Sequence, residues 1–100
     1  MQRRLIFCGL QSPNLTEDQA AALVRDLAME HFPKGHTIYE ATGRWRGLMV
    51  ECNERTLIVE VWEMAGFDQP ALAPMIADYK DLAQQESVVM LTVPCEAVVF

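Results

Sequence analysis

The chain has 100 residues, of which 51% are hydrophobic and 22% charged, and its formal net charge is −6. This length and composition are typical of one globular domain, which we predict to span residues 1–100. The acidic balance argues against a nucleic-acid partner, because neutralising phosphates requires clustered Lys and Arg. No apolar stretch approaches the length needed to cross a bilayer, which argues against a membrane protein.

Residues 3–10 form a short apolar run that ends in the turn residues Gln-Ser-Pro-Asn, which predicts a buried strand. Thr16 followed by Gln19 has the spacing of a capping box, so a helix is expected over residues 17–31. Apolar positions recur along that helix at helical spacing and predict one buried stripe. The stripe comprises Ala20, Leu23, Val24, Leu27, Ala28 and His31.

Residues 36–42, HTIYEAT, show an alternating pattern and are rich in residue types that favour strands, which predicts a second strand. Gly43 and Gly47 interrupt this pattern, which indicates a bulge or a sharp bend within the strand. Residues 48–51 can continue the same strand beyond the bend.

The polar stretch 52–55, Cys-Asn-Glu-Arg, is expected to be a hairpin connection. Residues 56–63, TLIVEVWE, follow it and form the strongest strand pattern in the chain. Strand alternation predicts that successive side chains of this strand lie on opposite faces. One face receives Leu57, Val59 and Val61, and the other receives Ile58, Glu60 and Trp62.

A second helix is expected after Asp68, which can cap it, with Pro70 in its first turn. Pro74 lies early in this helix and should kink it or delay its regular start. Residues 87–93 predict the last strand, and residues 97–100 a short extension at the sheet edge.

The order strand, helix, strand, strand, helix, strand predicts an α+β, ferredoxin-like βαββαβ fold. Right-handed crossovers then place both helices on one face of a four-stranded antiparallel sheet. The opposite face should be polar if it meets water. The sequence instead predicts an apolar face, because Ile58 and Trp62 are expected there and the last strand is apolar at nearly every position.

An apolar sheet face of this kind is best covered by a second copy of the same sheet. We therefore predict a homodimer or a higher closed oligomer, with Ile58, Trp62 and Met90 in the interface. The alternative is that the C-terminal segment of the same chain folds over the open face.

The three cysteines, Cys8, Cys52 and Cys95, are odd in number and contain no C-x-x-C pair. Free thiols of this kind are typical of a reducing compartment, so a cytoplasmic protein is expected. His31 and His36 have no metal-ligand spacing with these cysteines. Neither a metal nor a cofactor is predicted.

Arg44, Trp45 and Arg46 lie between two glycines in an otherwise acidic chain. Two guanidinium groups on one side of a strand can bind a carboxylate or phosphate, and His36 and Tyr39 complete this candidate ligand site. In the alternative interpretation, Trp45 anchors the bend and the two arginines pair across the hairpin. Their partners would then be Glu40, Glu51 or Glu60.

Two segments carry a resemblance to a known family. They are TIYEATGRWRG at residues 37–47 and YKDLAQQESV at residues 79–88. Over the C-terminal two thirds, the chain resembles the small bacterial proteins grouped as the domain of unknown function DUF3574. Members often carry an export signal; none is expected here, because the apolar run of residues 5–10 is shorter than the core of such a signal. The resemblance implies an α+β fold and supplies no activity.

No nucleophile, acid–base pair or phosphate-binding loop stands out, so no catalytic residue is predicted. The sequence favours a non-catalytic interaction protein that self-associates and binds a protein or a small anion. One alternative is a small cofactor-free enzyme of the dimeric α/β-barrel kind. Another is a bacteriophage protein that inhibits a host defence complex.

Overall fold

The structure, a computed structural model, describes residues 1–46, 51–63, 72–98 and 100. Its helices and strands follow one another in the predicted order. They are β1 (Gln2–Gly9), α1 (Glu17–His31), β2 (Thr37–Arg46), β3 (Glu51–Glu63), α2 (Leu72–Leu82) and β4 (Val89–Pro94).

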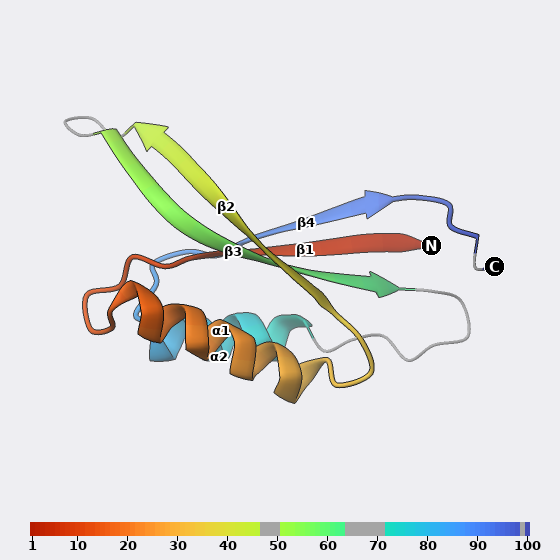
Figure 1. The fold of residues 1–100 in the computed structure, drawn as a ribbon, viewed down its shortest axis with the longest axis horizontal. Coiled ribbons are helices and arrows are strands. Elements are labelled where there is room, and N and C mark those ends of the chain that lie inside the picture. Colours follow the sequence, from red (N-terminus) through yellow and green to blue (C-terminus); the bar gives the residue numbers. More distant parts are fainter. Residues whose placement is uncertain (47–50, 64–71, 99) are drawn as a thin grey trace.

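The four strands form one antiparallel sheet in the order β2-β3-β1-β4. The first strand in the chain therefore lies inside the sheet, between β3 and β4. Both helices lie on the same face of the sheet (Figure 1). This arrangement confirms the predicted α+β, ferredoxin-like fold.

Helix α1 begins where the capping signal predicts. The Thr16 hydroxyl accepts a hydrogen bond from the Gln19 amide at 3.1 Å, and the Gln19 side chain accepts one from the Thr16 amide at 3.0 Å. Two backbone donors at the start of the helix are thereby satisfied. Glu17 and Asp18 lie in the first turn, where the helix dipole favours negative charge.

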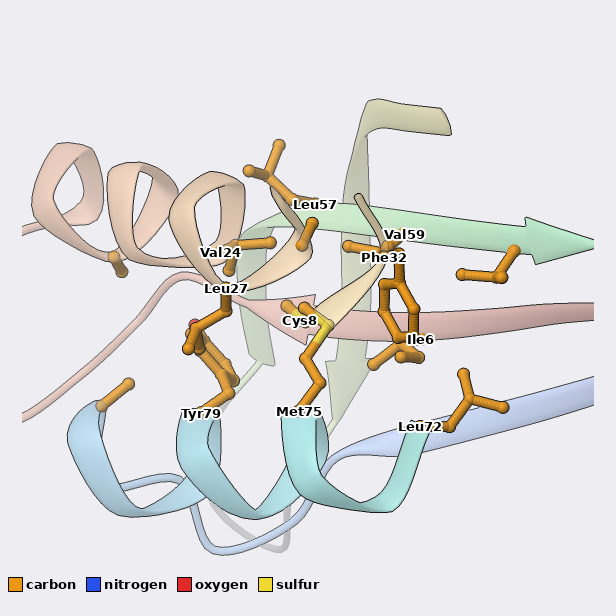
Figure 2. Close-up of a cluster of buried hydrophobic side chains, with 14 of the residues drawn as sticks. Ile6, Cys8, Val24, Leu27, Phe32, Leu57, Val59, Leu72, Met75 and Tyr79 are labelled. Carbon is orange, nitrogen blue, oxygen red and sulfur yellow. The ribbon is translucent and has the colours of Figure 1, made fainter. Parts of the chain in front are cut away.

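The core lies between the helices and one face of the sheet. Met75 of α2 extends toward Cys8 of β1, and Tyr79 extends toward Leu27 of α1 (Figure 2). Tyr79 is fully buried, and its hydroxyl donates a hydrogen bond to the Gly9 carbonyl, which satisfies the phenol inside the core. The sheet side of the core is made by Ile6, Cys8, Leu57, Val59 and Val61.

The hairpin between β2 and β3 differs from the prediction. β2 continues through Gly43, which pairs with Glu54, so no break occurs there. The stretch 52–55, expected to be the connection, lies inside β3, because Arg46 pairs with Glu51. The polar residues of that stretch are tolerated because one face of the strand meets water. Gly47 and the predicted continuation at residues 48–50 lie outside the described residues.

Pro74 lies near the start of the described part of α2. The described helix begins at Leu72, and Pro74 therefore lies in its first turn, where amide groups have no partner within the helix. Asp68 and Pro70, the expected cap and first turn, lie outside the described residues. At the C-terminus, residues 97, 98 and 100 belong to no strand, so the predicted edge extension is wrong for the residues described.

We expect Thr16→Ala to lower the free energy of unfolding by about 1 kcal/mol, because the Gln19 amide loses its acceptor. Thr16→Ser keeps the hydroxyl and should remain close to the wild type. Urea denaturation followed by circular dichroism measures both variants. Equal stability of the alanine and serine variants would contradict this role for the cap.

Candidate functional site: the open face of the sheet

The face of the sheet opposite the helices is built from alternate residues of all four strands. Cross-strand pairing places Leu5 beside Glu60 and Leu91, and places Ile58 beside Tyr39 and Phe7. We call this surface the open face. Its described positions are Arg3, Leu5, Phe7 and Gly9 of β1, Thr37, Tyr39, Ala41 and Gly43 of β2, Glu54, Thr56, Ile58, Glu60 and Trp62 of β3, and Val89, Leu91 and Val93 of β4.

A single carboxylate, that of Glu60, organises the polar centre of the open face. Arg3 binds it with two hydrogen bonds, from Nη2 to Oε1 at 2.8 Å and from Nε to Oε2 at 3.0 Å. The Trp62 indole N–H donates to Oε2 at 2.6 Å, and the Tyr39 hydroxyl donates to Oε1 at 3.2 Å. The carboxylate therefore receives four hydrogen bonds from side chains on three strands.

These contacts explain how a carboxylate with only 7% residue exposure persists on an apolar face. The hydrogen bonds from Arg3 hold the pKa of Glu60 at about 2, and those from Trp62 and Tyr39 add to the effect, while burial opposes it. Burial, reinforced by the hydrogen bond to Glu60, raises the pKa of the Tyr39 phenol. Glu60 is thus a fixed negative charge and a poor proton acceptor at neutral pH, which favours binding over acid–base catalysis.

Around this polar centre Leu5 and Ile58 are buried, while other apolar side chains of the open face are accessible. Trp62 is 54% exposed, Val89 56% and Leu91 47%. The alternative cover, the chain's own C-terminal segment, does not lie over them, because Val98 and Phe100 are themselves exposed. Figure 1 shows the C-terminal residues leading away from the end of β4. The face is therefore left uncovered by the described residues of this chain.

The predicted site residues fall into two groups. Tyr39 and Trp62 come together at Glu60, and Ile58 lies beside Tyr39 on the same face. Met90 does not join them, because it pairs with Ile6 and so lies on the helix side of the sheet.

The remaining predicted ligand residues lie apart from this centre in the chain. His36 precedes β2, and its Nδ1–H donates to the Phe32 carbonyl at 2.9 Å, which ties it to the end of α1. Arg44 lies on β2 near its end, and the side chain of Arg46 is outside the described set. The structure therefore does not bring Arg44, His36 and Tyr39 together through any hydrogen bond that it describes.

Two of the three proposed partners of the arginines are bound by other cations, and the side chain of the third, Glu51, lies outside the described set. Glu60 binds Arg3, and Glu40 accepts a hydrogen bond from Arg55 at 2.6 Å. Arg55 also reaches Glu17 and Asp18 of α1, each at 3.4 Å. These partners of Arg55 are largely exposed, so the cluster is a surface network of modest strength.

Arg3 is the residue of the centre that the sequence analysis missed. It is the first residue of the stretch 3–10, and no local pattern links it to Glu60, which lies 57 residues away in the chain. The available signal was Glu60 itself, an acid between Ile58 and Trp62 on an otherwise apolar side of β3. A buried acid of this kind requires a cation nearby.

The other reactive groups show no activation. Burial raises the pKa of the Cys8 thiol to about 12, which makes it inert, as its apolar context predicts. Among the described residues, no group of three His, Cys, Asp or Glu side chains is placed to hold a metal ion. Within the same residues, no helix has the length and apolar character needed to span a membrane.

Comparison with known proteins shows the family. The family model described as protein of unknown function (DUF3574) matches residues 2–99, so the chain belongs to this family over nearly its whole length. The resemblance found in the C-terminal two thirds is thereby confirmed and extended. No curated protein matches the chain.

Among solved structures, a phage SAM lyase in its apo state is similar in fold. The two chains share 15% sequence identity and superpose with a TM-score of 0.62. The match covers 91% of this chain and 78% of the lyase chain. At this identity the similarity supports the fold and carries no activity across.

We expect Glu60→Gln to lower the free energy of unfolding by about 1–3 kcal/mol at pH 7, because a charge-assisted network is lost. The folded pKa of Glu60 lies below its ordinary value, so its contribution is fully present above about pH 5 and declines as the pH falls toward 2. The difference between wild type and variant should therefore shrink over that range.

Urea unfolding at pH 7, 5 and 3 measures this difference. Glu40→Gln is the matched control, since Glu40 is an exposed carboxylate bonded to an arginine, and its effect should be small at every pH. A Glu60→Gln penalty that stays constant down to pH 3 would contradict the low pKa.

Proposed function

We propose that this member of the DUF3574 family is a non-catalytic interaction protein that self-associates through the open face. The observation that carries the proposal is the exposure of Trp62, Val89 and Leu91 on a sheet face that the described chain leaves uncovered. Exposed apolar patches on a sheet are typical of protein–protein contact. We place the oligomer in the cytoplasm, which the free thiols of Cys8 and Cys95 support.

A second copy fits this face better than a strongly charged partner. The Arg3 and Glu60 charges neutralise each other within the face and leave the apolar side chains around them free to pack. Two identical faces can meet about a twofold axis with their apolar residues in contact. In this arrangement Trp62 lies in the interface with the buried Ile58 beneath it, whereas Met90, on the helix side of the sheet, lies outside the interface.

The interface predicts that Leu91→Asp dissociates the oligomer, because a carboxylate would be buried against an apolar partner. Met29→Asp is the matched control, since Met29 is an exposed apolar residue on α1, on the other side of the molecule. Light scattering over a concentration series should give at least twice the monomer mass for wild type and control, and the monomer mass for Leu91→Asp. A wild type that is monomeric at high concentration would sink the proposal.

A small enzyme is the second candidate, and the Glu60 centre is the observation that favours it. The exposed rings of Trp62 and Tyr39, held in place by their hydrogen bonds to Glu60, offer aromatic faces of the kind that bind organic cations. The similar structure is a SAM lyase, and SAM is a sulfonium cation. That lyase is a phage protein. Its origin supports a phage setting for this chain, as in the hypothesis of a phage protein that inhibits a host defence complex.

Titration calorimetry with SAM tests the second candidate. If the Glu60 centre binds this cation, Trp62→Ala should weaken binding by about tenfold, the equivalent of one cation–π contact. Leu82→Ala, at an exposed apolar residue of α2, should leave it unchanged. Absence of binding to the wild type at millimolar SAM would remove this candidate.

A further inference from the structure

The strand β4 lies at one edge of the sheet, and among the described strands it is paired with β1 alone. In antiparallel pairing, successive residues turn their N–H and C=O groups alternately toward the two sides of a strand. Just past β4, the Cys95 amide donates to the Met1 carbonyl at 3.1 Å, in continuation of the β1–β4 register. Odd-numbered residues therefore bond toward β1, and the amides of Met90 and Thr92 face the outer edge.

Both faces of β4 are exposed. Val89 and Leu91 are exposed on the open face, and on the helix side Met90 is 38% exposed and Thr92 is exposed as well. A second copy stacked on the open face would cover only the first of these two sides. A strand added at the edge continues both faces of the sheet, so its side chains pack beside both sides of β4.

The sequence of β4 also lacks the usual protection of an edge strand. Exposed edges are commonly kept from pairing by charged side chains. The strand at the other edge, β2, contains Glu40 and Arg44, and β1 and β3 contain charged residues too. β4 has the sequence VMLTVP, with no charge, and its Pro94 interrupts pairing only at the end of the strand.

Charge and symmetry identify a second β4 as the partner strand. The chain has a net charge of −6, so two copies approach each other most favourably where neither presents a charge, and among the described strands only β4 is uncharged. Two identical strands that pair antiparallel about a twofold axis close the contact at two copies. Pairing of β4 with β2 of another copy would instead leave an edge open at each end and grow into a filament.

The directions of the amides fix the register of such a pair. Residues whose amides point outward lie opposite one another, so even-numbered residues pair with even-numbered ones. With Leu91 opposite Leu91 of the second copy, Met90 lies opposite Thr92, and both outward amides meet a carbonyl. Val89 then lies opposite Val93, so the side-chain pairs on the open side are all apolar.

The neighbouring registers satisfy the strand less well. A shift of two residues in one direction places Pro94, which has no N–H, opposite Met90. The same shift in the other direction places Thr92 opposite Val88, which lies outside β4. The register centred on Leu91 therefore uses the strand most completely.

We infer that β4 pairs antiparallel with β4 of a second copy, which joins two four-stranded sheets into one continuous sheet. This edge contact is separate from the open face and goes beyond the proposed function. It leaves both open faces on the same side of the joined sheet, so the two contacts together assemble four copies.

Disulfide crosslinking of the full chain tests the edge contact. Met90→Cys and Thr92→Cys are made as separate proteins, each with Cys52→Ser and Cys95→Ser, then mixed to exchange subunits and oxidised. Opposed residues of a hydrogen-bonded pair have Cα atoms about 5.5 Å apart, a distance that a disulfide spans. A covalent dimer should form in the mixture. Each variant alone is the matched control and should stay monomeric on a denaturing gel, because its cysteine faces Thr92 or Met90 of the second copy.

The outcomes separate the edge contact from the open-face contact. Met90 and Thr92 lie on the helix side, so copies joined only through their open faces cannot form this disulfide. A covalent dimer in the mixture alone supports the edge contact. If light scattering shows an oligomer and the mixture yields no more covalent dimer than the single variants, the edge contact is overturned and the open-face contact stands. A monomeric wild type overturns both.

Hydrogen exchange followed by NMR is an independent measurement on the wild type. The amides of Met90 and Thr92 are bonded in the edge pair, and they should exchange at least about tenfold more slowly than in Leu91→Asp, where two carboxylates would face each other. The amide of Val59, inside the sheet, is the control and should be protected in both proteins. Equal exchange at positions 90 and 92 in the two proteins would overturn the inference, because contact through the open face alone leaves these amides in water.

Discussion

Two helices cover one face of a four-stranded sheet. The alternation of side chains along each strand determines which residues lie on the opposite, uncovered face. Ile6 and Cys8 of β1 and Leu57 and Val59 of β3 enter the core, so every intervening residue of those strands is turned away from the helices. Those intervening positions hold Leu5, Phe7, Ile58 and Trp62 as well as polar groups. The hydrophobic effect that builds the core therefore also produces a second, uncovered apolar surface.

The Glu60 centre shows how a charge is accommodated on that surface. Removing a carboxylate from water is unfavourable unless hydrogen bonds replace the hydration that is lost. Arg3 supplies two such bonds across the β1–β3 pair, and Tyr39 and Trp62 each supply one. The same bonds fix the orientation of both aromatic rings. The centre is consequently a polar cluster within an apolar face, and its hydrogen bonds orient both aromatic rings toward the surface that a partner would contact.

Local signals in the sequence were sufficient for much of the fold. The capping box at Thr16 located the start of α1, and the alternation in TLIVEVWE assigned Ile58 and Trp62 to the open side. The hairpin was misplaced because the polar stretch 52–55 has turn composition, whereas the register of the strands is set by pairing along their whole length. Local composition carries little information about that pairing.

The candidate site was predicted less completely than the fold, because its central contact joins distant residues. Tyr39 and Trp62 were identified separately, one as a ligand residue and one as an interface residue, and the fold joins them through Glu60. The partner that makes this possible, Arg3, lies near the start of the chain and reaches Glu60 only because β1 pairs with β3. That pairing places β1 in the interior of the sheet and frees β2 and the end of β3 to extend past it. The topology that assembles the polar centre therefore also lets β2 and the first part of β3 continue past β1 as a two-stranded ribbon.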